Sequence, residues 1–142
     1  MKNLTTRMMI AAAVLAVAAV SASAQTYKAE IPLTFRAAGV QMLPGSYKVT
    51  IMRHESGIPY VQVINIDSKK SAFLMSYPGQ DAPKAWVNAG HPMLAFECVA
   101  ESCSLKQLWN GTDSATYRFA TPKPAHGEAH AELVVVKLAS TD

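Results

Sequence analysis

The segment 94–109 constrains the fold of this chain more than any other, because it carries the only two cysteines. Cys98 and Cys103 are separated by four residues, a spacing that lets the two strands of a β-hairpin bring them opposite each other. The facing pairs would be Cys98–Cys103, Phe96–Leu105 and Leu94–Gln107. Side chains alternate between the faces of a strand, so these six residues would share one face of the hairpin. Glu97 would lie diagonal to Lys106 on the other face.

The beginning of the chain has the pattern of an export signal. Lys2 and Arg7 make it positive, and Met8–Val20 is an unbroken apolar run. This run is shorter than the roughly 20 residues that a membrane-spanning helix needs. Small residues follow it up to Ala24, where a signal peptidase would cut. We therefore expect residues 1–24 to be a signal peptide and the mature protein to be periplasmic or secreted. A retained N-terminal anchor is the alternative.

Residues 25–142 are long enough for one domain with a substantial core. Two of the 13 basic residues lie in the leader, so 11 basic and 10 acidic side chains remain. The mature chain has no run of basic residues, and nothing in the linear sequence argues for nucleic acid or an anionic membrane as a partner.

The two cysteines fit a structural disulfide best. Export takes them to an oxidising compartment, where a disulfide is favoured over free thiols. Closing so short a loop would stabilise the fold by about 2 kcal/mol in the chain-entropy model. A redox pair and a metal site are the alternatives, although the spacing matches neither Cys-x-x-Cys nor the haem motif Cys-x-x-Cys-His. We expect no cofactor.

Alternation of apolar and polar residues predicts strands along most of the chain. In residues 27–35 the alternation is strict, and Pro32 places this strand at a sheet edge because proline cannot donate a ladder hydrogen bond. Residues 46–53 alternate in the same way. Residues 58–66 and 71–77 are apolar on both faces, which is typical of central strands. Further strands are expected at 40–43 and 132–139.

The 94–109 hairpin is expected to continue into a third strand. A two-residue Asn-Gly turn would set Leu108 against Asp113, so we prefer a five-residue loop over 110–114. The pairs would then be Trp109–Ala115, Gln107–Tyr117 and Leu105–Phe119. In this register the inner face carries Leu94, Phe96, Leu105, Trp109, Tyr117 and Phe119. About eight short strands and no convincing helix predict an all-β fold, a single antiparallel β-sandwich or a small barrel.

Residues 78–92 contain three prolines and two glycines and are expected to form a long loop, where function often lies. Trp86 could serve there as an aromatic platform for a peptide or sugar, with Lys84 and His91 at its rim. The alternative is a lid whose tryptophan closes one end of the core.

One histidine pair has metal-ligand spacing. His126 and His130, with Glu128 between them, would converge on one face of a helix and bind a metal ion there. The neighbouring prolines and Gly127 argue against a helix, and four residues of extended chain span about 13 Å. A solvated loop is the alternative.

A resemblance to a known group rests on two elements. These are Ile31-Pro32-Leu33-Thr34-Phe35 and Leu43-Pro44-Gly45-Ser46-Tyr47-Lys48-Val49. They resemble small secreted bacterial proteins of unknown function with a Leu-Pro-Ala-Gly-x-Tyr turn, although this chain lacks the alanine. A similar turn occurs in transthyretin-like and immunoglobulin-like sandwiches. The resemblance implies an exported all-β domain, and Tyr47 fits a core or corner tyrosine.

The sequence therefore favours an exported, non-enzymatic binding or envelope-associated module. No Gly-x-Ser-x-Gly elbow is present, and we expect no enzyme. The partner would be a protein or a glycan, not nucleic acid, and it would contact residues 78–92 or add a strand to residues 27–35. A periplasmic metal-binding protein is the second hypothesis, and a small hydrolase without a sequence signature is the third. No stable membrane span is expected after cleavage.

Overall fold

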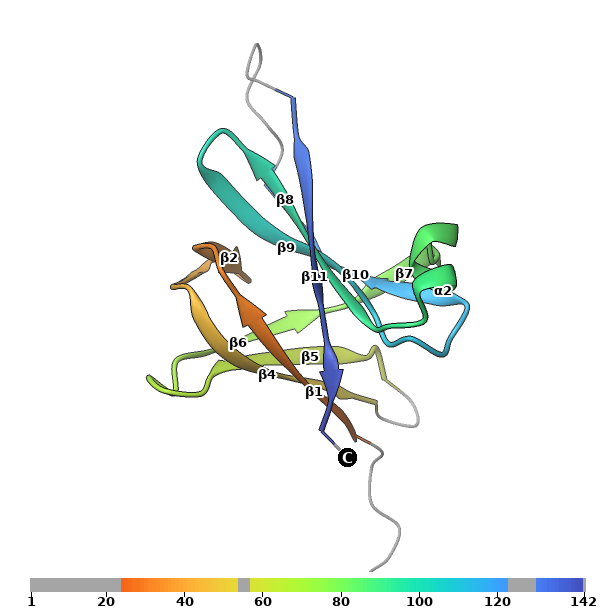
Figure 1. The fold of residues 1–142 in the computed structure, drawn as a ribbon. Coiled ribbons are helices and arrows are strands. Elements are labelled where there is room, and N and C mark those ends of the chain that lie inside the picture. Colours follow the sequence, from red (N-terminus) through yellow and green to blue (C-terminus); the bar gives the residue numbers. More distant parts are fainter. Residues whose placement is uncertain (1–23, 54–56, 123–129, 142) are drawn as a thin grey trace, which may run out of the picture.

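The computed structural model describes residues 24–53, 57–122 and 130–141, which form two β-sheets around one main core (Figure 1). The predicted all-β sandwich is confirmed. Ala24, the last residue of the predicted leader, is the first residue of the first strand, and the rest of the leader lies outside the described residues. In the part of the chain that the structure describes, no helix has the length and apolar character needed to cross a membrane.

The first sheet has the strand order β12-β1-β4-β5-β6 and is antiparallel throughout. Its strands are β1 (Ala24–Ile31), β4 (Gly45–Met52), β5 (Tyr60–Asn65), β6 (Ser71–Met75) and β12 (Ala139–Ser140). Alternate residues of each long strand face the core, as the period of two predicts. In β4, for example, Tyr47, Val49 and Ile51 are buried.

The second sheet has the strand order β11-β8-β9-β10-β7. Its strands are β7 (Tyr77–Asp81), β8 (Met93–Val99), β9 (Ser102–Trp109), β10 (Ala115–Arg118) and β11 (Glu132–Lys137). A small hairpin of β2 (Phe35–Ala37) and β3 (Val40–Met42) joins it, because β2 pairs in parallel with β9. The described residues thus form twelve strands instead of about eight, and the additional ones are short.

Two of the passages of the chain from one sheet to the other join strands that both lie at sheet edges. β6 continues into β7 through Ser76, and β11 continues into β12 through Leu138. Both connecting residues are buried, and their backbone N–H groups donate to the carbonyls of Pro59 and Pro92, at 3.1 and 2.9 Å respectively. Each of these edges is therefore one continuous segment that belongs to both sheets.

An aromatic cluster joins the two sheets inside the core. The centroid of the Phe35 ring lies 5.3 Å from that of Tyr47 and 5.1 Å from that of Phe96, both edge to face. Tyr47 belongs to the first sheet, and the two phenylalanines belong to the second. The Tyr47 hydroxyl donates to the Leu43 carbonyl, four residues upstream, so Tyr47 is a core and corner residue as predicted.

The prediction of one edge strand over 27–35 is wrong. β1 ends at Ile31, and Phe35 already belongs to β2 in the other sheet. β1 pairs with β4 along its whole length and with β12 over two residues, so it is not an edge. Pro32 ends the strand instead of lying within it, because its nitrogen has no hydrogen to donate.

The hairpin of β8 and β9 has the predicted register at its tip and a shifted one at its base. Cys98 pairs with Cys103, and Phe96 pairs with Leu105, as predicted. A β-bulge then adds one residue on β9, so that Leu94 pairs with Leu108 rather than with Gln107. The bulge turns Trp109 to the opposite face, which corrects its predicted place on the inner side of the meander.

The bulge also moves the third strand of the meander. The loop 110–114 has the preferred five residues, but Tyr117 pairs with Leu108 and not with Gln107. Tyr117 and Phe119 remain in the main core, as predicted. The apolar face therefore decides the pairing, and the shift follows from the bulge on β9.

The prediction of a structureless segment over 78–92 is also wrong. It contains most of β7 and a six-residue helix, α2 (Lys84–Ala89), so the expected absence of helix is corrected as well. Helix α2 ends at Gly90, whose φ of 70° is left-handed and suits glycine at a helix C-terminus.

β6 lies at a sheet edge although its sequence is apolar on both faces. β5 is interior, as predicted, but β6 is the last strand of the first sheet, and Tyr77 belongs to β7. Phe73 and Met75 point outward and are exposed. The apolar residues on the outer face of β6 are therefore not explained by a central position of the strand in the sheet. Exposed apolar residues that gather on one surface often mark an interaction site.

Candidate functional site

Helix α2 turns the tryptophan of the 78–92 segment inward. The side chain of Trp86 is 6% exposed and lies in a second, smaller core on the far side of β8 and β9. This core consists of Trp86, Met93, Ala95 and Trp109. Trp86 is thus buried, in this second core and not in the main one, while Lys84 and His91 remain exposed at the surface.

Most of the predicted metal ligands lie outside the described residues. This is so for His126 and Glu128, whereas His130 is exposed just before β11. Within the described ranges, no three histidine, cysteine, aspartate or glutamate side chains come close enough together to hold an ion. The metal site at 126–130 stays a prediction.

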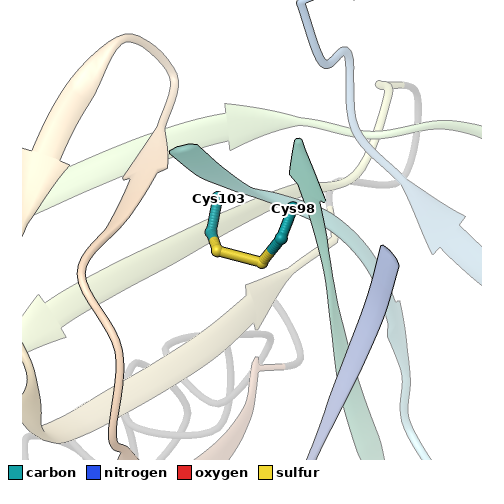
Figure 2. Close-up of a disulfide and its surroundings, with 2 residues drawn as sticks. All are labelled: Cys98 and Cys103. Carbon is teal, nitrogen blue, oxygen red and sulfur yellow. A yellow bond between two sulfur atoms is a disulfide. The ribbon is translucent and has the colours of Figure 1, made fainter. Parts of the chain in front are cut away.

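The two cysteines form the predicted disulfide near the tip of the β8–β9 hairpin (Figure 2). Their Cα atoms are 4.0 Å apart, on directly paired positions of the two strands.

Cys103 also lines a cleft of about 430 Å³ between the hairpin tip and the β2–β3 hairpin, together with Arg36, Gln41 and Glu101. The salt bridge between Lys106 Nζ and Glu97 Oε2, at 2.5 Å, lies farther along the same hairpin, on the diagonal predicted for it.

A more apolar groove, of about 540 Å³, lies where the chain passes from β6 to β7. Its walls come from the segment before β5, from the β6–β7 crossing and from β10. They include Ile58, Pro59, Met75, Tyr77, Thr116 and Tyr117. The volume falls within the range of ligand sites in proteins. We call this feature the crossing groove.

The large apolar side chains on the rim of the crossing groove are more exposed to solvent than such side chains usually are. Ile58 is 59% exposed, Met75 is 66% exposed and Tyr77 is 57% exposed. Three large apolar side chains around one groove form a contiguous apolar surface of the kind that marks binding sites. The lining residues that carry a hydroxyl group are Ser76, Tyr77, Thr116 and Tyr117.

A polar cluster holds Tyr117 in place beside the crossing groove. Arg53, just after β4, donates to the Tyr117 hydroxyl, and its guanidinium carbon lies 5.5 Å from the centroid of the Tyr117 ring. Arg53 Nη2 also lies 2.6 Å from Asp113 Oδ2, and Asn110 Nδ2 donates to the same oxygen at 2.9 Å. The cluster ties the end of the first sheet to the 110–114 loop of the second.

The charges of this cluster affect the acidity of Asp113. The hydrogen bond from Arg53, and then the one from Asn110, hold the pKa of the Asp113 carboxyl below its ordinary value. A lowered folded-state pKa means that the carboxylate stabilises the fold above the pKa of the unfolded chain, near 4. That stabilisation is lost as the pH falls through the folded-state pKa.

We expect Asp113→Asn to lower the free energy of unfolding at neutral pH by less than about 1 kcal/mol, since both partners are more than two-fifths exposed. The difference between variant and wild type should begin to shrink below about pH 4, where the carboxyl of the unfolded wild-type chain takes up a proton, and should disappear below the lowered pKa of the folded state. Urea unfolding at neutral and acidic pH measures it. Asp81→Asn, at an exposed strand end, is the control. A difference that persists unchanged in acid would show that the charge of Asp113 is not what stabilises the fold.

The residues of the crossing groove were not predicted as a site. They come from segments that are far apart in the sequence, and the apolar outer positions of residues 71–77 pointed to a central strand. The alternative was that no further layer covers the outer face of this strand, which leaves Phe73 and Met75 exposed. Sequence periodicity does not distinguish these two cases.

Comparisons of the chain with known protein families, with curated proteins and with solved structures found no match.

Proposed function

We propose that this protein is an exported, non-enzymatic β-sandwich that binds an extended segment of a cell-envelope protein along its β6–β7 edge. The observation that carries the proposal is the crossing groove, an apolar cavity with an exposed apolar rim at the place where the chain passes from one sheet edge to the other. An apolar side chain of the partner would fill the groove.

The edge strands give this segment a place to bind. Among the described strands, β6 pairs only with β5, and β7 pairs only with β10, so one side of each strand has no strand partner. Backbone groups on such an edge can pair with an added strand, and pockets beside it then select side chains. Because β6 and β7 are continuous through Ser76, a single partner segment could follow both.

Two features support export. The apolar segment Met8–Val20 with its basic start has the form of a signal peptide, and the Cys98–Cys103 disulfide fits an oxidising compartment. A periplasmic or secreted module is the form in which we expect it to act.

Photo-crosslinking tests the proposal. With p-benzoylphenylalanine in place of Tyr77, irradiation in an envelope extract should give a discrete adduct. The same group in place of Val135 should give no adduct, because Val135 is exposed on β11, at the opposite edge of the second sheet from β7. Ile58→Asp puts a charge on the groove rim and should reduce the Tyr77 adduct about tenfold or more, because an unpaired charge resists desolvation. Val87→Asp, on the exposed side of α2, is the matched control.

Equal adducts from positions 77 and 135, or none from position 77, would contradict binding at the crossing groove. So would an adduct that Ile58→Asp leaves unchanged, provided that circular dichroism shows the variant to be folded.

A further inference from the structure

The outer face of the first sheet combines exposed apolar and basic side chains. Strand register places them in rows across the sheet. One row runs Ala24, Met52, Tyr60 and Met75, the next runs Thr26, Thr50, Gln62 and Phe73, and the third runs Lys28, Lys48, Ile64 and Ser71. An antiparallel sheet that faces water on one side normally carries polar residues there, and this face departs from that pattern.

The apolar part lies on β5 and β6. Phe73 is 56% exposed, and its ring centroid lies 6.2 Å from that of Tyr60 on the neighbouring strand. Met75 lies beside them at the end of β6, and Met52 and Ile64 of the adjoining rows are half-buried. Phe73 does not line the crossing groove, so this apolar surface extends beyond it.

The basic part lies on β1, β4 and the turn before β6. Lys28 and Lys48 are directly opposite each other on neighbouring strands, and both are exposed. Lys69 and Lys70, exposed in the turn that leads into β6, add two more positive charges. Like charges on facing positions of a sheet are destabilising, so the Lys28–Lys48 pair is unfavourable in the isolated protein.

The acidic side chains of this region, Glu30 and Asp67, offset only part of the charge of the four lysines and leave a net charge of +2 (4 − 2). Glu30 accepts a hydrogen bond from the hydroxyl of Ser46, and Asp67 lies exposed in the turn after β5. The two salt bridges found among the described residues are Arg53–Asp113 and Lys106–Glu97, and neither contains a lysine of this face.

The charge of this face indicates which kind of partner it binds. Lysine is depleted in protein–protein interfaces, whereas lysines beside exposed aromatic and aliphatic side chains are favoured at the surface of an anionic bilayer. We propose that the outer face of the first sheet docks on an anionic lipid bilayer. Phe73 and Met75 enter the interfacial region, and Lys28, Lys48, Lys69 and Lys70 lie at the headgroup phosphates. Met75 also lies on the rim of the crossing groove, but the proposal requires no ligand in that groove.

Vesicle sedimentation tests it, using the predicted mature chain, residues 25–142. The protein should bind vesicles of equal parts phosphatidylcholine and phosphatidylglycerol, should not bind pure phosphatidylcholine, and should be released by salt. Lys28→Gln/Lys48→Gln should weaken binding about tenfold or more. Phe73→Ser should weaken it about fivefold. Soluble glycerol phosphate should not compete, because the proposed ligand is the surface and not a single phosphate.

Matched controls exist on the other sheet. Lys84→Gln/Lys137→Gln removes the same charge from exposed sites on α2 and β11, and Val135→Ser removes an exposed apolar side chain. Both should bind like wild type. The Lys28→Gln/Lys48→Gln variant should be at least as stable as wild type, because a repulsive pair is removed.

No binding to the anionic vesicles at low salt, equal binding to neutral ones, or equal losses in the control variants would overturn the proposal. Failure here would leave crosslinking at Tyr77 unaffected, and failure of that crosslinking would leave vesicle binding unaffected, so the two proposals can be rejected separately.

Discussion

Replacing Gly79 by alanine should destabilise the fold by about 3 kcal/mol or more, near the upper end of what added core volume costs. A Cβ atom at Gly79 would lie 1.8 Å from the carbonyl oxygen of Thr116 and 2.7 Å from its carbonyl carbon. Both atoms belong to the backbone of β10, which cannot move aside as a side chain can. The register of β10 against β7 shifts at this position, between Ala115 and Tyr117.

Thermal unfolding measures this loss, which should lower the midpoint by roughly 10 °C. Gly90→Ala is the matched control, because its φ of 70° strains an alanine although a Cβ there would meet no atom within 4 Å. We expect that variant to lose only about 1 kcal/mol. If Gly79→Ala were no more destabilised than Gly90→Ala, the backbones of β7 and β10 would not lie as close together at Gly79 as described here.

Phe35→Ala should destabilise the fold by about 4 kcal/mol, in the range for truncating a buried phenylalanine. Phe35 is 1% exposed and contacts one aromatic ring from each sheet, Tyr47 and Phe96. Its removal leaves a cavity where the two layers meet and also removes two edge-to-face contacts, which adds to the lost apolar burial.

Denaturant unfolding measures the free energy of unfolding of Phe35→Ala and of the control variant Phe73→Ala, which removes the same side chain from the surface. Phe73 is 56% exposed on the outer face of β6, and its truncation should cost about 0.5 kcal/mol or less. Similar losses in the two variants would contradict the assignment of Phe35 to the core and Phe73 to the surface.

Local sequence predicted the elements whose pairing partner lies nearby in the chain. Cys98 and Cys103 are joined by a short turn, so their spacing alone fixed the register at the hairpin tip. The alternation in β4 likewise predicted which of its residues are buried, including Tyr47. In both cases the period of two is a property of the strand itself.

The sequence-based predictions were wrong where the position of a residue depends on contacts with segments far away in the chain. A bulge opposite Ala95 and Phe96 sends Trp109 toward the core under α2, and a second apolar surface is needed to make that favourable. Trp86 on α2 supplies it. Phe73 is exposed because it points to the outer face of the first sheet, which no described element covers, and the number of layers is set by packing of the whole domain.

The sequence by itself determined the class of the fold, the disulfide and the inward faces of most strands, because periodicity and cysteine spacing act over a few neighbouring residues. Only the tertiary structure decided the strand order, the edge formed by β6 and β7, and the gathering of Lys28, Lys48, Phe73 and Met75 on one face. These depend on contacts between segments far apart in the chain, whose free energy no local pattern records.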